Sequence, residues 1–263
     1  MRLLPLLMCL MATPLAAHEL WIEPVEFQPA AGARVEAHLV NGQGFEGLHL
    51  PYLPKSMVRF SVAFQGVETA VTGRIGDKPA MQVAGSDGLM VAVYQSAPTT
   101  VRYDEFAKFE RFATHKDLGD VQALHLARGL VVGPLVEVYT RYSKSLIGAG
   151  GAVGADAALG LETELVALDN PYLGRPRVLR VQLFYRGVAR AEAQVEVFEK
   201  AADGTVVVTL QRTDAEGVAQ VPVRSGHVYM LDAVVLREPG PALAEEFGAD
   251  WESLWANLTF AVP

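Results

Sequence analysis

Alternation of apolar and polar side chains is the dominant pattern of this chain beyond residue 17. Apolar residues stand at every second position from Leu179 to Tyr185, with Arg180 and Gln182 between them. Such a period of two is typical of strands that bury one face. The pattern recurs twice before residue 211, with turn-forming Asp and Gly residues between the segments. It predicts a mainly β protein with antiparallel sheets packed as sandwiches.

The first half of the chain is also predicted to be rich in strands, with a short helical insertion. Phe106, Phe109 and Phe112 are spaced to share one face of a helix. The helices are expected over 103–113 and 121–127, and the strands over 57–66, 89–95 and 100–103.

A run of small residues suggests where two domains meet. Residues 148–154 read GAGGAVG, a composition typical of a connecting segment. We therefore expect two β-sandwich-like domains, an N-terminal one over 18–154 and a C-terminal one over 155–263.

The first seventeen residues have the features of a secretory signal peptide. Arg2 precedes an apolar run, and Ala16 and Ala17 close the segment with small side chains. Cys9 is the single cysteine of the chain and lies inside this segment, so no disulfide is expected in the mature protein. We expect export to a bacterial periplasm, and no stable membrane insertion is expected because no later stretch supplies about 20 consecutive apolar residues.

Charge and motifs exclude several functional classes. Removing residues 1–17, which contain Arg2 and no acidic residue, takes the formal net charge from −8 to −9. Nucleic acid is an unfavourable partner for such a chain. The sequence contains no G-x-S-x-G or H-E-x-x-H motif and no nucleophilic cysteine after residue 17, so we expect a protein that is not an enzyme.

Histidines supply the candidate metal ligands. Cleavage after Ala17 would leave His18 with a free amine and an imidazole, two nitrogen donors that suit nickel, cobalt or copper. His38 lies in a strand-like segment, and His49 follows Glu46 in a loop flanked by glycine. A metal site built from His18, His38 and His49, with Glu46 as a further donor, is the resulting hypothesis.

Two other groups of residues admit both a structural and a functional interpretation. In 137–146, Glu137 and Arg141 share a face if the segment is a strand, and they favour an ion pair that braces the two domains. The alternative is an anion pocket that uses Arg141 and Lys144. Trp251 and Trp255 are expected to be buried ahead of a final strand over 258–262, with sugar or partner binding as the alternative.

Seven segments in order resemble a known family. They are HELWIEP (18–24), GFEGLHLPYLP (44–54), GRIGDKPA (73–80), EVYTRYSKSL (137–146), LGLETELVALDNPY (159–172), TDAEG (213–217) and WESLWANLTF (251–260). Together they are similar to a bacterial family of unknown function that is associated with periplasmic components of cobalt and nickel transport systems. The resemblance implies an N-terminal β-rich domain followed by a sandwich like prealbumin and carboxypeptidase regulatory domains.

The resemblance implies a function as well. It favours a periplasmic protein that binds nickel or cobalt, with copper as an alternative, and delivers it to a membrane metal transporter. In the members most directly associated with these metals a histidine precedes the aromatic-acidic pair, where this chain has Gln43 and Gly44 before Phe45. Two alternatives stay open: a copper histidine-brace oxidative enzyme that uses His18, and an envelope module that binds carbohydrate or protein.

Overall fold

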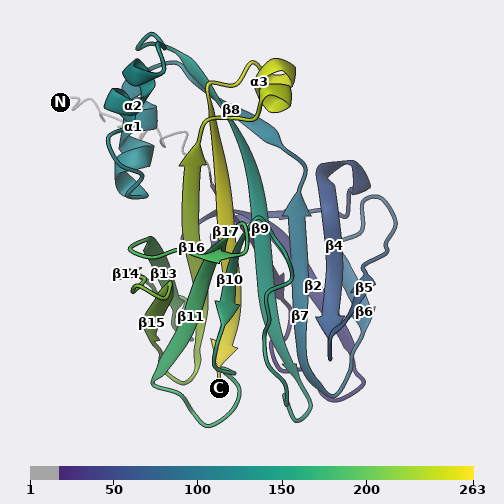
Figure 1. Cartoon of the computed structure of the whole chain (residues 1–263). Coiled ribbons are helices and arrows are strands. Elements are labelled where there is room, and N and C mark those ends of the chain that lie inside the picture. The colour runs from purple at the N-terminus through teal and green to yellow at the C-terminus, as the bar shows by residue number, and fades with distance from the viewer. Residues whose placement is uncertain (1–17) are drawn as a thin grey trace, which may run out of the picture.

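The computed structural model describes residues 18–263, and its strands form three sheets. The signal-peptide prediction falls on residues 1–17, outside the described residues. The mainly β prediction is confirmed, and the sheets are stacked in a sandwich-like arrangement (Figure 1).

A nine-stranded sheet forms the middle layer. Its strand order is β14-β13-β16-β17-β9-β7-β4-β5, and β8 also pairs with β9. These strands are β4 (Met57–Phe64), β5 (Val67–Ala70), β7 (Gly88–Ser96), β8 (Thr99–Tyr103), β9 (Leu135–Ala149), β13 (Gln194–Lys200), β14 (Val206–Arg212), β16 (His227–Arg237) and β17 (Trp251–Val262). The neighbours are antiparallel except β9 and β17, which run parallel from Glu137 beside Trp251 to Ser145 beside Thr259.

Two four-stranded sheets cover the middle layer. The first contains β1 (Glu19–Pro24), β2 (Arg34–Gln43), β3 (Glu46–Leu50) and β6 (Met81–Ala84). The second contains β10 (Thr163–Ala167), β11 (Val178–Tyr185), β12 (Val188–Ala189) and β15 (Val218–Pro222).

The alternation along β7 shows that the two smaller sheets lie on opposite faces. Met90 and Ala92 belong to the apolar cluster that includes Ile22 of β1, whereas Val91 and Val93 belong to the cluster that includes the apolar face of β11. Because successive side chains of a strand point to opposite sides, one covering sheet packs on each face. The middle sheet is therefore buried on both faces over much of its width.

The helices lie at one end of the molecule (Figure 1). They are α1 (Phe106–His115), α2 (Val121–Ala127), α3 (Pro241–Phe247) and the short 3-10 helix η1 (Pro54–Ser56). The aromatic spacing predicted the buried face of α1, although the helix starts at Phe106 rather than at 103, because Tyr103 ends β8. Phe106, Phe109 and Phe112 are buried, and Phe112 stacks on Trp255 with ring centroids 5.6 Å apart. Trp251 and Trp255 are buried as expected, but the final strand starts at Trp251, seven residues before the predicted 258.

Strands from both sides of residue 155 share the middle sheet. β9 lies before this point, and its neighbour β17 ends the chain. Lys144 of β9 adds a buried link, because its ammonium lies 2.8 Å from Asp156 and 3.0 Å from Glu164. The division into 18–154 and 155–263 as separate domains stays a prediction.

The structure also contains no helix, within residues 18–263, that is both long and apolar enough to cross a bilayer.

Candidate functional site

The first polar site lies on the face of the β1-β2-β3 sheet that carries Trp21 and Val40, next to β13, and contains two of the three predicted ligands. His38 of β2 pairs with Glu23 of β1, and Val40 of β2 pairs with His49 of β3. Residues two apart on a strand share a face, so His38, His49 and Glu23 lie on the same side of the sheet.

Their side chains are in contact. The imidazole rings of His38 and His49 stack with centroids 3.9 Å apart and an interplanar angle of 24°. Nε2 of His49 lies 3.9 Å from a carboxylate oxygen of Glu23, and the ammonium of Lys200 lies 3.9 Å from the other oxygen. A pocket of about 410 Å³ adjoins the site, with Glu23, His38 and Lys200 in its wall.

The electrostatics of this site favour a neutral imidazole. Burial lowers the pKa of His38, and the neighbouring His49 lowers it further, against the opposing effect of Glu23 and Glu36. A neutral imidazole has a free lone pair and is the form that binds a metal ion. Two imidazoles and a carboxylate form a donor set that suits borderline divalent ions.

His18 lies away from this pair. It precedes β1, whereas Glu23 lies five residues further along the strand, about 16 Å at 3.3 Å per residue. The His18 carbonyl accepts hydrogen bonds from Nε and Nη2 of Arg141, at 3.0 and 2.6 Å. The structure therefore brings His38 and His49 together but not His18. Glu46 is three residues before His49 on β3 and faces the opposite side of that strand.

The remaining histidines have protein partners. His125 is buried, accepts a hydrogen bond from Trp251 at 3.0 Å and lies 3.2 Å from the Val131 carbonyl. His115 lies 2.7 Å from Glu196, and His227 lies 2.8 Å from Glu199.

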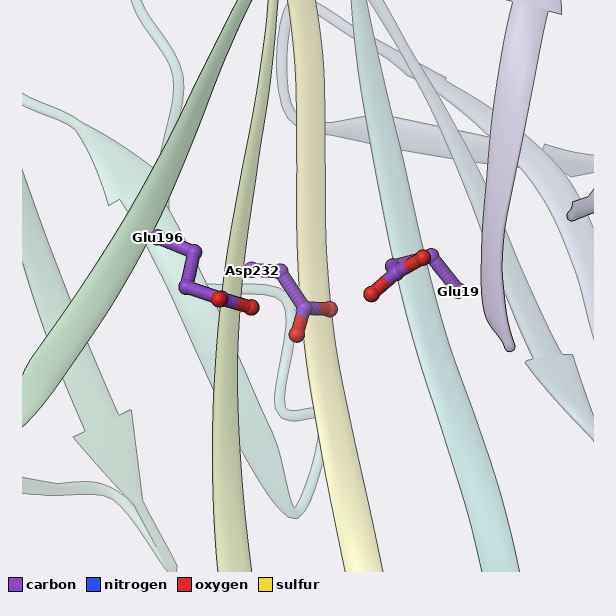
Figure 2. A group of neighbouring side chains, drawn as sticks. All are labelled: Glu19, Glu196 and Asp232. Atoms are coloured by element: carbon purple, nitrogen blue, oxygen red, sulfur yellow. The ribbon is translucent and has the colours of Figure 1, made fainter. Parts of the chain in front are cut away.

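A second polar site is buried between β1 and the middle sheet. Glu19, Glu196 and Asp232 point toward one another from β1, β13 and β16 (Figure 2), and each offers a carboxylate oxygen within 4.8 Å of the others. Within residues 18–263, this is the one group of three His, Cys, Asp or Glu residues whose possible ligand atoms all lie this close together.

Lys116 supplies the positive charge of this acidic cluster. Lys116 directly follows α1 in the sequence. Its ammonium donates hydrogen bonds to Glu19 at 3.2 Å, to Asp232 at 2.9 Å and to Glu196. It also lies 4.8 Å from the centre of the Trp255 ring. Burial raises the pKa of Glu19 to about 7 despite the nearby ammonium, and burial also raises the pKa of Asp232. The chain thus fills this site with its own cation, which gives the cluster a structural role in holding α1 on the sheet.

Sequence reasoning missed Glu23 of the first site and all four residues of the second, which are Lys116, Glu19, Glu196 and Asp232. Glu23 is two residues after Trp21 in the HELWIEP segment, so the sequence indicates that the two share a face of the strand. It does not indicate that β2, with His38, pairs with this strand. Lys116 follows the helix without any motif, and its three partners are 97, 80 and 116 residues away.

Comparison with known proteins assigns the family. The sequence profile of the family described as Domain of unknown function (DUF4198) matches residues 15–237. The chain belongs to this family. The DUF4198 match extends through β1, both polar sites and the strands on either side of residue 155.

Other comparisons add little to this assignment. No match was found among curated proteins. A solved structure described as "Crystal structure of tetra-tandem repeat in extending region of large adhesion protein" is 13% identical over 93% of this chain, with a TM-score of 0.21. The chain spans 49% of the length of that structure.

Proposed function

We propose that this DUF4198 protein binds a divalent transition-metal ion through His38, His49 and Glu23. The observation that supports the proposal is the stacked His38–His49 pair with the Glu23 carboxylate 3.9 Å from His49. Nickel and cobalt are the favoured ions because of the family resemblance, and copper is the competing ion because it binds most nitrogen sites more tightly.

We propose that this site closes around its ion. His38, His49 and Glu23 do not converge as tightly as the acidic cluster does, so ion binding would draw them together by side-chain rotation. His49 is half-exposed and Glu23 partly exposed, which leaves an approach from solvent. Such a site suits a protein that binds and releases its cargo, and we propose delivery to a membrane metal transporter in the periplasm.

The alternatives receive less support from the structure. All three tryptophans are buried, at 0%, 3% and 1% exposure for Trp21, Trp251 and Trp255, so none presents a ring to a sugar. A histidine brace needs a second histidine beside the His18 amine, whereas His38 and His49 lie toward the other end of β1.

Calorimetric titration of the purified protein with Ni(II), Co(II), Cu(II) and Zn(II) tests the proposal. We expect His38→Ala and His49→Ala each to weaken binding at least about tenfold, and Glu23→Gln to weaken it less, because loss of a ligand removes a metal–donor bond. His115→Ala is the matched control, since its imidazole is exposed and pairs with Glu196 rather than with a proposed ligand. Equal affinity in His38→Ala and His115→Ala would refute the site.

A second arm separates this site from one at the His18 amine. An alanine inserted before His18 removes that amine from the histidine but leaves β1 and its neighbours unchanged. We expect metal affinity to be unchanged in this variant. We also expect it to stay level between pH 8.5 and 7, although a terminal amine, with a pKa of roughly 7.7 to 8.0, gains its proton in this range. Lost binding on insertion would place the ion at His18.

A further inference from the structure

Arg141 is a buried cation without an acidic partner. The residue is 6% exposed, and no carboxylate within residues 18–263 lies within 4.0 Å of its nitrogens. Residues 1–17 contain no Asp or Glu, so none can come from there. The guanidinium instead donates to the His18 carbonyl and lies 4.2 Å from the centre of the Tyr139 ring.

The other buried cations of this chain show the contrast. Lys116 has three carboxylates and Lys144 has two. Glu137 lies four residues before Arg141, but the predicted ion pair does not form: the Glu137 oxygens accept hydrogen bonds from Tyr103 and Ser253. A buried charge that is not matched by an opposite charge is unfavourable, and a ligand of opposite charge relieves that cost.

Arg141 lines a pocket of about 350 Å³, at the lower end of the size range of small-molecule sites. Lys55 of η1 is a second cation in the wall, and no acidic residue lines the pocket. Leu20, Leu50 and Pro98 give it apolar sides. The pocket therefore combines positive charge with room for a carbon skeleton.

A further polar atom in this wall has no partner. Asn41 of β2 lines the pocket, and its Oδ1 is buried without a hydrogen bond. A bound molecule with a hydroxyl or amino group would supply the missing donor. The phenol of Tyr94 is already used, because it donates to the Ser56 carbonyl at 3.1 Å.

We propose that this pocket binds a small organic carboxylate, with its anionic group on Arg141 and Lys55 and a hydroxyl or amino group on Asn41. Inorganic phosphate shares the charge but lacks the carbon skeleton that Leu20 and Pro98 would contact. Lys144, the other cation of the predicted anion pocket, lies on the opposite face of β9 with Asp156 and Glu164 and takes no part. The proposed site is independent of the metal site at His38 and His49.

Titration calorimetry on metal-free protein tests the site with L-malate, succinate, acetate and inorganic phosphate. Chelator-treated protein is used so that a carboxylate does not act through a bound metal ion. We expect L-malate to bind more tightly than succinate, which lacks only the hydroxyl, and both to bind more tightly than phosphate. Phosphate that binds as well as L-malate would overturn the carboxylate assignment, and dissociation constants above about 10 mM for all four would overturn the site.

Variants identify the residues responsible. Lys55 is exposed on η1, so Lys55→Glu reverses a charge of the wall without disturbing the interior. We expect it to weaken L-malate binding at least about tenfold, with thermal unfolding unchanged, whereas Lys108→Glu on exposed α1 surface leaves binding unchanged. Arg141→Met is expected to abolish binding. Equal binding by Lys55→Glu and Lys108→Glu would contradict the proposal even if Arg141→Met fails to fold.

Discussion

Buried charge is the feature that most distinguishes individual residues of this protein. Lys116, Glu19, Glu196 and Asp232 are all less than 10% exposed, and three carboxylates share one ammonium. Removing charges from water costs several kcal/mol per ion unless partners replace the water. The burial of the three carboxylates therefore depends on the positive charge of Lys116.

Replacing Lys116 tests this dependence. We expect Lys116→Met to lower the free energy of unfolding by about 3 to 5 kcal/mol at pH 8, because it leaves uncompensated carboxylates in the interior. The loss should be smaller at pH 5, where Glu19, whose pKa is raised to about 7, is mainly protonated; the raised pKa of Asp232 acts in the same direction. Urea unfolding at both pH values measures the difference, with Lys108→Met as the exposed control. Equal losses at the two pH values would contradict this account.

Glu137 provides a separate pH prediction. Burial raises its pKa from 4.5 to about 7, although Ser253 and Tyr103 donate hydrogen bonds to it and Arg141 lies nearby. Between pH 4.5 and 7 the folded state then binds more protons than the unfolded state, so this residue makes stability fall as pH rises through that range. The difference corresponds to about 3 kcal/mol. We expect Glu137→Gln to remove most of this decline in urea unfolding, and an unchanged decline would show that other groups cause it.

At the scale of elements, the pairing of β2 with β3 in a hairpin brings together the two histidines of the proposed metal site. Gly42 and Gly47 face each other in its register, and an added Cβ at Gly42 would lie 1.9 Å from the Glu46 carbonyl oxygen. Only glycine allows the two backbones to approach this closely. The same strand pairing places His49 of β3 against His38 of β2.

Widening this hairpin should weaken metal binding without changing a ligand. We expect Gly42→Ala to shift β3 away from β2 and to lower metal affinity at least about tenfold. Gly133→Ala is the control, because an added Cβ there meets no atom within 4 Å. Titration calorimetry measures both variants. Wild-type affinity in Gly42→Ala would show that the ion does not need both histidines.

At the scale of the whole molecule, the parallel pairing of β9 with β17 connects the two halves of the chain. Nine residue pairs join these strands, from Trp251 with Glu137 to Thr259 with Ser145. The Lys144 contacts with Asp156 and Glu164 add a buried ion cluster across the predicted boundary. A fragment that ends near residue 154 would lack the neighbour of its central strand.

Calorimetric unfolding tests whether the halves are independent. We expect one transition, with a calorimetric enthalpy close to the van't Hoff enthalpy, because neither half completes the middle sheet alone. Lys144→Met should lower the midpoint without splitting the transition. Two separate transitions would instead support independent domains over 18–154 and 155–263.

Local pattern was sufficient to determine the type of most elements. The alternation from Leu179 to Tyr185 matches β11, and the helix predicted over 121–127 matches α2. These predictions succeed because the side-chain periods of strands and helices depend on residues close in sequence. The aromatic spacing of α1 likewise indicated its buried face.

Tertiary structure alone decided which residues meet. Strand pairing across long sequence separations places Lys116 among Glu19, Glu196 and Asp232, brings His38 to His49 while His18 stays apart, and leaves Arg141 without an acid. A period of two identifies a strand and its faces but not its neighbour or its register. For this protein the sequence by itself determined the β architecture, and the packing of three sheets determined the chemistry of its sites.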